Sequence, residues 1–320
     1  MTAEAVERFG CFGDECVVLV AGGGPAGQAT DAAARARRRM GACHEQFSRF
    51  DPTSELSRLN RNPHRTVAVT PAMARFVEVA LAAAEATNGL VDPTLVRGLE
   101  RAGYDRHLIS NSLPLERALS LAPPRAPARP RQRADWTSIE VDRRAGAVTR
   151  PPGVALDSGG IAKGLVGDIL ATLLEGHAAF AIEAAGDVRF GGAATWRRPV
   201  HVTSPFDGAL LHVFDLVRGA AATSSIGRRA WLDPEGRPAH HLLDPATGRP
   251  AFTGVVQATA LAPTGIEAET RSKAALLVGP DAAAGWLPHG GLLVLDDGRV
   301  SMIDPATSLN GVPSTTAIAA

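Results

Sequence analysis

Runs of apolar residues with two different spacings divide the chain into short strands and helices. Apolar residues that recur every three or four positions predict helices, and short runs rich in β-branched or aromatic residues predict strands. Pro71 suits the first turn of one helix, and Asn88-Gly89 supplies the turn that ends it. The predicted strands are 17–20, 138–142, 180–182, 201–203, 210–217 and 291–295, and the predicted helices follow residue 27 or span 71–87, 164–174 and 266–278.

Helices and short strands are interspersed along the chain, which predicts an α+β fold of the layered α/β type. At 320 residues the chain is long enough for two domains or one large one. A stretch rich in Pro and Arg at residues 114–133 predicts an irregular surface connection. We therefore expect a single domain over residues 1–320, in which this connection could join two subdomains.

Composition argues against several classes of protein. The 33 basic residues balance 33 acidic ones, and aromatic residues make up 5%, so we expect no nucleic-acid surface. No apolar run approaches the roughly 20 residues of a membrane span. Three cysteines without metal-ligand spacing predict a reducing compartment. Arginines at positions 35 and 37–39 stand where a signal or lipoprotein sequence needs apolar residues, so we expect a cytoplasmic protein.

Lysine is almost absent from the chain. Only two of the 33 basic residues are lysines, Lys163 and Lys273. Lysine carries a compact charge with an adjustable pKa, whereas arginine is a planar and permanent cation. Because arginine would serve any site that needs only a solvated positive charge, both lysines are candidate functional residues. Chance retention is an equal alternative for each.

A glycine-rich turn follows the first predicted strand. Gly22, Gly24 and Gly27 match the G-x-G-x-x-G pattern that binds a dinucleotide in Rossmann folds. That pattern also requires a second strand ending in an acidic residue about 20 positions later, and residues 40–47 contain no such strand. We therefore favour an ordinary turn, and keep a Rossmann oxidoreductase as an alternative.

Polar and glycine-rich segments far apart in the chain form a more specific pattern. In one of them, Asp157 precedes a glycine turn that enters a helix containing Lys163. Small residues let the backbone approach a ligand, a helix N-terminus attracts phosphate, and lysine supplies a point charge. In another, His241 and Asp244 flank two apolar residues, where a buried structural histidine is an equal alternative. The segments are 47–60, 91–94, 156–168, 185–187, 222–225 and 241–248.

In order and spacing these segments resemble the ApbE family of flavin transferases, from about Phe12 to about Gly279. The matching patterns are S-E-L-S-R-x-N, G-G-I-A-K-G, G-D and H-x-x-D-P-x-T-G. The resemblance implies an ApbE-like fold of mixed β-sheets flanked by helices, with FAD in a cleft between two subregions. It also implies a reaction, in which the FMN part of FAD moves to a Thr or Ser hydroxyl of an acceptor protein and AMP is released.

The resemblance assigns roles to individual residues. His241 would lie near the diphosphate or adenosine of FAD, and Phe50 stands where many members have a tyrosine beside the flavin. Glu269, Lys273 and His241 would act in catalysis. The residues expected to bind FAD are Phe12, Phe50, Val91, Asp92, Pro93, Asp157, Gly160, Lys163, Asp187, Thr223, His241 and Leu242.

The same resemblance implies a Mg²⁺ ion, held by an A-D-x-x-x-T helix and the carbonyl of a glycine, here Gly160. In this chain Glu269 replaces the Asp and Lys273 replaces the Thr, which leaves Gly160 and Glu269 as the expected metal ligands. A charged ammonium has no lone pair with which to bind a cation. We interpret Lys273 as taking part of the metal's role, with a surface Glu–Lys pair of little energetic weight as the alternative. The requirement for Mg²⁺ is left open.

Two other functions are compatible with the same residues. An FAD pyrophosphatase would use water in place of the acceptor hydroxyl and release FMN and AMP. An FAD-binding or carrier protein would have lost catalysis together with the metal helix. The acceptor protein of a transferase cannot be identified from this chain.

Overall fold

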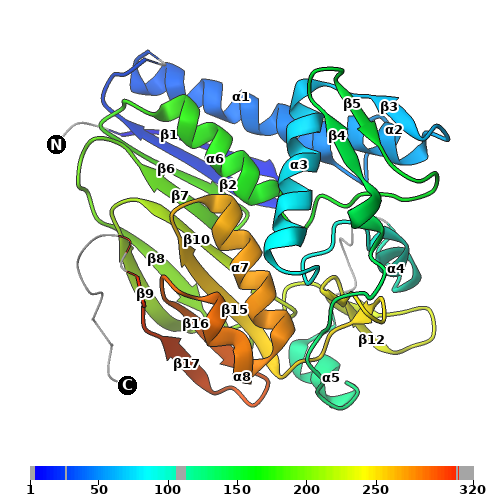
Figure 1. The fold of residues 1–320 in the computed structure, drawn as a ribbon. Helices are drawn as coiled ribbons and strands as arrows, with labels where there is room; N and C mark the ends of the chain where they lie inside the picture. The colour runs from blue at the N-terminus through cyan, green and yellow to red at the C-terminus, as the bar shows by residue number, and fades with distance from the viewer. Residues whose placement is uncertain (1–3, 26, 106–112, 308, 310–320) are drawn as a thin grey trace.

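The computed structural model describes residues 4–25, 27–105, 113–307 and 309, and its centre is one eight-stranded sheet (Figure 1). The strand order is β1-β2-β6-β7-β10-β15-β16-β17, and within the described residues every strand pair is antiparallel. Together with the helices this confirms the α+β class. The strands are β1 (Glu4–Cys11), β2 (Asp14–Ala21), β6 (Ala179–Ala184), β7 (Asp187–Gly191), β10 (Gly219–Ser225), β15 (Val255–Ala262), β16 (Gly291–Leu295) and β17 (Val300–Ile303).

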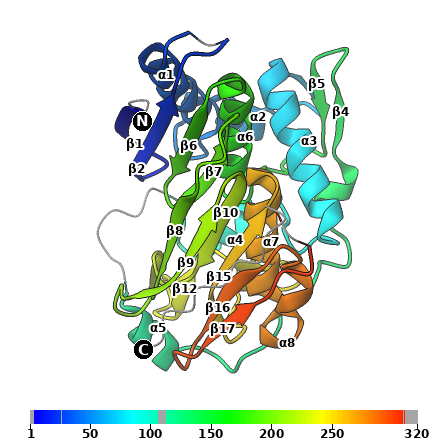
Figure 2. The same cartoon turned by 90° about the vertical axis from the view of Figure 1, so that its left-hand side faces the viewer.

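Helices cover one face of this sheet (Figures 1 and 2). They are α1 (Ala29–Phe47), α6 (Ala162–Leu174) and α7 (Gly265–Val278), with α3 (Pro71–Ala86) against α6 and α7. The other face receives the hairpin of β8 (Arg198–Thr203) and β9 (Leu210–Leu216). Gln257 of β15 donates from that face to the carbonyl oxygen of Thr203. Both faces of the central strands are therefore buried.

Shorter elements surround these layers. Part of the predicted 114–133 connection is helical, because Leu115 and Ala118 bury one face of α5. The rest runs irregularly along the body, where Ala126 and Ala128 donate to the carbonyls of Phe252 and Leu277. The shorter elements are α2 (Glu55–Arg61), α4 (Val96–Arg101), α5 (Leu115–Ser120), α8 (Pro280–Ala283), η1 (Asp135–Ser138), η2 (Ala284–Trp286), β3 (Thr66–Ala68), β4 (Glu140–Asp142), β5 (Ala147–Thr149), β11 (Ala230–Leu232), β12 (Pro238–His240), β13 (Leu243–Asp244) and β14 (Arg249–Pro250).

The Rossmann alternative for the glycine-rich turn is wrong. The turn follows β2, whose two neighbours in the sheet are both antiparallel to it, whereas a dinucleotide fold requires parallel strands. Gly24 and Gly27 exchange two backbone hydrogen bonds of 3.0 and 2.9 Å, which close the turn. A Cβ atom at Gly24 would lie 2.7 Å from Nδ1 of the buried His177. These glycines therefore serve packing.

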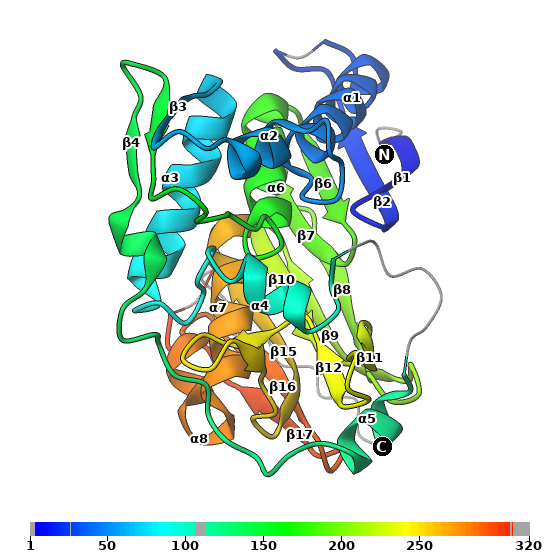
Figure 3. The same ribbon diagram turned by 90° about the vertical axis from the view of Figure 1, so that its right-hand side faces the viewer.

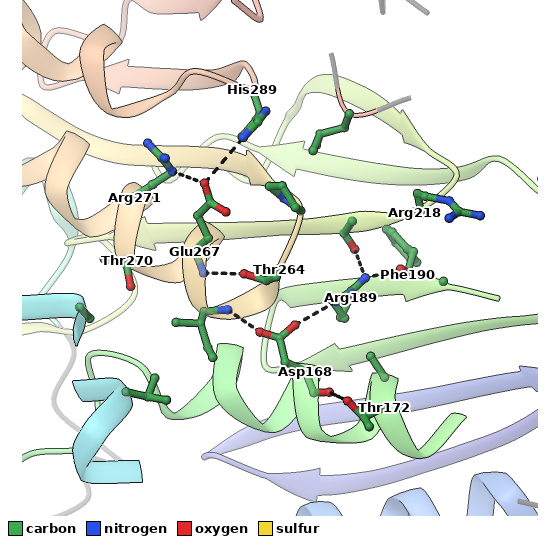
Figure 4. Close-up of a pocket in the computed structure, with 18 of the residues that line it drawn as sticks. Asp168, Thr172, Arg189, Phe190, Arg218, Thr264, Glu267, Thr270, Arg271 and His289 are labelled. Atoms are coloured by element: carbon green, nitrogen blue, oxygen red, sulfur yellow. Dashed lines mark hydrogen bonds and ion pairs between the residues drawn. The ribbon is translucent and has the colours of Figure 1, made fainter. Parts of the chain in front are cut away.

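Helices α6 and α7 cross at Gly164 and Gly265 in direct backbone contact. A Cβ atom at Gly164 would lie 2.4 Å from the carbonyl oxygen of Gly265, and one at Gly265 would lie 2.6 Å from that of Gly164. Asp168 of α6 accepts the first N–H groups of α7, from Gly265 at 2.8 Å and Ile266 at 3.0 Å (Figure 4). This crossing brings the first turn of α6 against the first turn of α7, close to Glu269.

Candidate functional site

The glycine turn before α6 is held against two of the other predicted segments. Asp157 accepts the N–H of Gly159 at 2.9 Å, which shapes the turn. Its own N–H donates to the carbonyl of Pro93, and a Cβ atom at Gly160 would lie 3.5 Å from Val91. The second oxygen of Asp157 accepts from Nε of Arg49 at 2.8 Å. The fold thus brings the segments 47–60, 91–94 and 156–164 together.

Lys163, Asp187 and Thr223, all predicted to bind FAD, lie in one chain of contacts. Nζ of Lys163 lies 2.8 Å from one oxygen of Asp187, and the other oxygen accepts the N–H of Thr223 at 3.1 Å. Burial alone would lower the pKa of Lys163, but the carboxylates of Asp187 and Glu269 outweigh it and raise that pKa above its usual value. Lys163 is therefore a stable cation whose side chain remains 25% exposed.

Glu269 and Lys273 form a buried ion pair on α7. Nζ of Lys273 lies 3.1 Å from Oε1 of Glu269, and Oε2 of Glu269 accepts the N–H of Gly164 at 2.8 Å. Glu269 is 1% exposed and Lys273 is 7% exposed. The alternative of a surface pair is wrong, because the α6–α7 crossing buries both side chains.

His241 lies within the electrostatic reach of several cations. Burial holds the pKa of His241 well below its usual value, and the positive charges of Arg229, Lys273 and Lys163 lower it further. The imidazole is therefore uncharged near neutral pH. Its Nδ1 atom is buried and has no hydrogen-bond partner among the described residues. Leu242, the next residue, is buried in an apolar cluster that also contains Phe252 and Val255.

An aromatic and arginine cluster adjoins His241, on the side where α2, α4 and the β11–β12 hairpin lie (Figure 3). The Arg49 guanidinium lies 4.4 Å from the ring centroid of Phe50 and 5.1 Å from that of Tyr104. Tyr104 stacks on Trp231 at 5.3 Å, and its hydroxyl accepts from Arg229 at 3.0 Å. Its ring centroid is 6.4 Å from that of His241.

The sequence did not single out Arg49, Tyr104, Arg229 or Trp231. Tyr104 could have been recognised as a candidate from the sequence, because it is the only tyrosine of the chain. Arg49 lies within a recognised segment, whereas Arg229 is one of many arginines and carried no signal at all.

Phe12 and Asp92 approach the same region from other segments. Phe12 has a positive φ of 53° at the tip of the β1–β2 hairpin, and its carbonyl accepts from Arg229 at 3.3 Å. One oxygen of Asp92 accepts the N–H of Thr94 at 2.7 Å. The other is buried and has no hydrogen-bond partner among the described residues, and neither has Nη2 of Arg49. Burial raises the pKa of Asp92, although the hydrogen bonds from Thr94 oppose the shift.

The residues present do not fit the Mg²⁺ ion that the resemblance implies. One oxygen of Glu269 already binds the Lys273 ammonium and the other binds the N–H of Gly164. An ion between Glu269 and Gly160 would lie close to a fixed positive charge, which opposes its binding. Among the described residues, no group of three or more His, Cys, Asp and Glu side chains could hold a metal.

A large cavity lies elsewhere, between α3, α6 and α7 (Figure 4). Its volume is about 1280 Å³, and none of the predicted site residues lines it. Two ion pairs lie among its lining residues: Arg189 pairs with Asp168 at 2.9 Å, and Arg271 pairs with Glu267 at 2.7 Å. Because the predicted site residues lie away from this cavity, we place the candidate site at the lysine and arginine cluster around His241.

Comparisons with known proteins identify relatives of this chain. The profile described as "ApbE family" matches residues 12–294. A protein of Treponema pallidum (strain Nichols), named FAD:protein FMN transferase, is 26% identical over 261 residues, which cover 73% of this chain and 68% of that protein. A protein of the same name from Escherichia coli (strain K12) is 27% identical over 149 residues, 45% of this chain and 42% of that protein. The crystal structure of the Thermotoga maritima ApbE protein is 25% identical, with a TM-score of 0.77 over 94% of this chain and 97% of that one.

Proposed function

The chain belongs to the ApbE family, and on that premise we propose that it is an FAD:protein FMN transferase. It would bind FAD, move the FMN part to a Thr or Ser hydroxyl of an acceptor protein, and release AMP. The relatives from Treponema pallidum and Escherichia coli carry this name.

The convergence of positive charge on His241 carries the proposal. Lys163, Lys273 and Arg229 come from three separate segments, and all three lower the pKa of the same imidazole. The diphosphate of FAD is the part of the ligand that requires such a concentration of cations. The glycine turn before α6 adds backbone N–H groups at a helix N-terminus, which also favour phosphate.

Unpartnered polar atoms in the same region support a polar ligand. Buried polar groups in folded proteins nearly always have a hydrogen-bond partner, so the exceptions require an explanation. Nη2 of Arg49, Oδ2 of Asp92 and Nδ1 of His241 are exceptions among the described residues. We propose that hydroxyl, amine or phosphate groups of bound FAD satisfy them.

The remaining predicted residues have roles that follow from their positions. We propose that Phe12 and Phe50 contact the ring systems of FAD, and that Val91 and Pro93 hold the turn that contains Gly160. Asp187 and Thr223 would position Lys163, and the backbone of Leu242 would position His241. A cleft between two subregions stays a prediction.

Phosphoryl transfer in this site would depend on positioning and charge neutralisation more than on covalent catalysis. The acceptor oxygen would form a bond to the FMN-side phosphorus while the bond from that phosphorus to the bridging oxygen breaks. AMP would leave with the electron pair, and the hydroxyl proton would be released. Lys163, Lys273 and Arg229 would neutralise the phosphates, and the uncharged His241 could hydrogen-bond them without adding charge.

We also propose that residues 1–320 act as one domain. There are two large apolar clusters, one with buried residues of β2, β6, α1 and α6 and the other with buried residues of β10, β15 and α7. The same eight-stranded sheet contributes to both, which supports one unit. A cytoplasmic location is proposed because Cys11, Cys16 and Cys43 are free and buried thiols. No helix among the described residues is long and apolar enough to cross a bilayer.

The decisive experiment incubates the purified protein with FAD and purified candidate acceptor proteins. Transfer predicts that the acceptor gains the mass of one covalent FMN group, with one AMP released for each group attached. Free FMN together with AMP, and no change in the acceptor, would support the pyrophosphatase. Recovery of bound but intact FAD with every acceptor would support a carrier. Replacing the modified Thr or Ser of the acceptor by Ala should abolish the mass gain.

A further inference from the structure

We propose that the ammonium group of Lys273 is the resident cation of this site, in the position where the family resemblance implies Mg²⁺. FAD binding and transfer then need no divalent ion. The inference rests on the proposed function, since it concerns the charge that faces the FAD diphosphate, and it goes further by naming what replaces the metal.

The first support is the way the cation is anchored. Nζ of Lys273 lies 3.1 Å from Oε1 of Glu269, one helical turn away on the same face of α7. The other oxygen of Glu269 accepts the N–H of Gly164 at 2.8 Å. Because Gly164 and Gly265 are in backbone contact, α6 lies close enough to α7 for this N–H to hold the Glu269 carboxylate.

The second support is burial. Glu269 is 1% exposed and Lys273 is 7% exposed. Removing two charges from water is costly, and well-packed apolar residues often stabilise a fold at least as well as a buried ion pair does. A pair of this kind, made by one of only two lysines in an arginine-rich chain, is therefore poorly explained as a stabilising contact. A site that needs a compact cation explains it.

The third support is the location of the charge. Lys273 and Lys163 both act on His241, so the two lysines of the chain share one region with Arg229. Asp187 pairs with Lys163, Glu269 pairs with Lys273, and Asp157 pairs with Arg49 in the adjoining cluster. A fixed ammonium in this region suits a diphosphate and opposes the entry of a further cation.

The binding test measures the affinity of the protein for FAD by titration calorimetry, first in EDTA and then with millimolar Mg²⁺. We expect the dissociation constant to change by less than about twofold between the two conditions. A wild-type protein that binds FAD only when Mg²⁺ is present would overturn the inference and leave the proposed function standing.

The side-chain test replaces Lys273 by methionine, which keeps most of the length and removes the charge. In EDTA we expect FAD to bind at least about tenfold more weakly. Because Lys273→Met leaves a buried carboxylate unpaired, the double variant Glu269→Gln/Lys273→Met serves if the single variant does not fold. The matched control is Glu267→Gln/Arg271→Met, which removes another i,i+4 pair of α7, 2.7 Å apart and outside the site. Unchanged affinity in both Lys273 variants would refute the inference.

A metal-binding test is independent of FAD and of turnover. Titration of the ligand-free protein with Mn²⁺, followed by electron paramagnetic resonance, should show no site near Glu269. The variant Glu269→Asp/Lys273→Thr, which restores the family pattern, should bind Mn²⁺ and should bind FAD more tightly when Mg²⁺ is added. Binding of Mn²⁺ to the wild-type protein that is lost in Glu269→Gln would overturn the inference. Failure of the wild-type protein to bind FAD under any condition would overturn both proposals.

Discussion

Replacing Lys163 by methionine should lower both the stability of the folded protein and its affinity for FAD, and the two effects have different causes. In the folded protein its ammonium lies 2.8 Å from a carboxylate oxygen of Asp187, a residue that is 7% exposed. Without Lys163, that carboxylate keeps the N–H of Thr223, at 3.1 Å, as its partner. Breaking a fully buried pair costs roughly 3–5 kcal/mol. Because Lys163 is 25% exposed, water offsets part of the loss, and we expect the free energy of unfolding to fall by about 1–3 kcal/mol.

The effect on FAD binding has a different origin. A charge-assisted hydrogen bond from Lys163 to the diphosphate contributes roughly 1–3 kcal/mol, so its loss should raise the dissociation constant about 5- to 150-fold. The double variant Lys163→Met/Asp187→Asn separates the two effects. It removes the unpaired carboxylate and should recover most of the stability, while the affinity for FAD stays low.

Urea unfolding measures the stability of the three proteins, and calorimetric titration measures their affinity for FAD. Normal FAD affinity in Lys163→Met would show that Lys163 only supports the fold. Recovery of affinity in the double variant would show that the single variant binds poorly because its site is distorted. Either result would refute the assignment of Lys163 to the diphosphate.

Three further predictions concern the ligand, the helix crossing and pH. The protein should bind FAD more tightly than FMN or riboflavin in calorimetric titrations, and equal affinity for riboflavin would mean that the diphosphate is not recognised. Gly164→Ala should lower the unfolding free energy by about 1–3 kcal/mol, because its Cβ meets the Gly265 carbonyl, whereas Gly41→Ala, with open space at its Cβ, should not destabilise α1 in the same urea assay. Burial holds the pKa of His240 at about 3, against 6.5 when it is exposed, so the unfolded chain binds more protons between these values. Stability should therefore fall as pH decreases from about 6.5 towards about 3, and His240→Leu should show a shallower loss in pH-dependent unfolding.

Local patterns in the sequence were sufficient to predict part of the secondary structure. Helices α3, α6 and α7 and the strand β16 lie close to their predicted ranges, because each has a clear apolar period or a strong run. The central strand β15 was not predicted from the sequence, although all of its residues are buried. It is covered on both faces, and Gln257 and Thr259 interrupt its apolar residues, so it has neither regular alternation nor a strong apolar run.

The order and spacing of short motifs were sufficient to identify the family, and several of the segments they singled out lie together in the fold. They did not reveal Arg229, Tyr104 or Trp231, because these residues join the site through contacts with segments far away in the chain. Arg229 reaches both Tyr104 and Phe12, and only the folded arrangement places those three residues side by side.

The sequence alone determined that Glu269 and Lys273 stand one helical turn apart in place of an Asp and a Thr. It could not determine whether the pair is exposed, because an i,i+4 pair has the same spacing on a surface and in an interior. The tertiary structure decided that question through two glycines. Without side chains at Gly164 and Gly265, helices α6 and α7 approach in backbone contact, and a backbone N–H of one helix becomes the partner of the Glu269 carboxylate. That contact buries the ion pair and places its ammonium beside the other cations of the site.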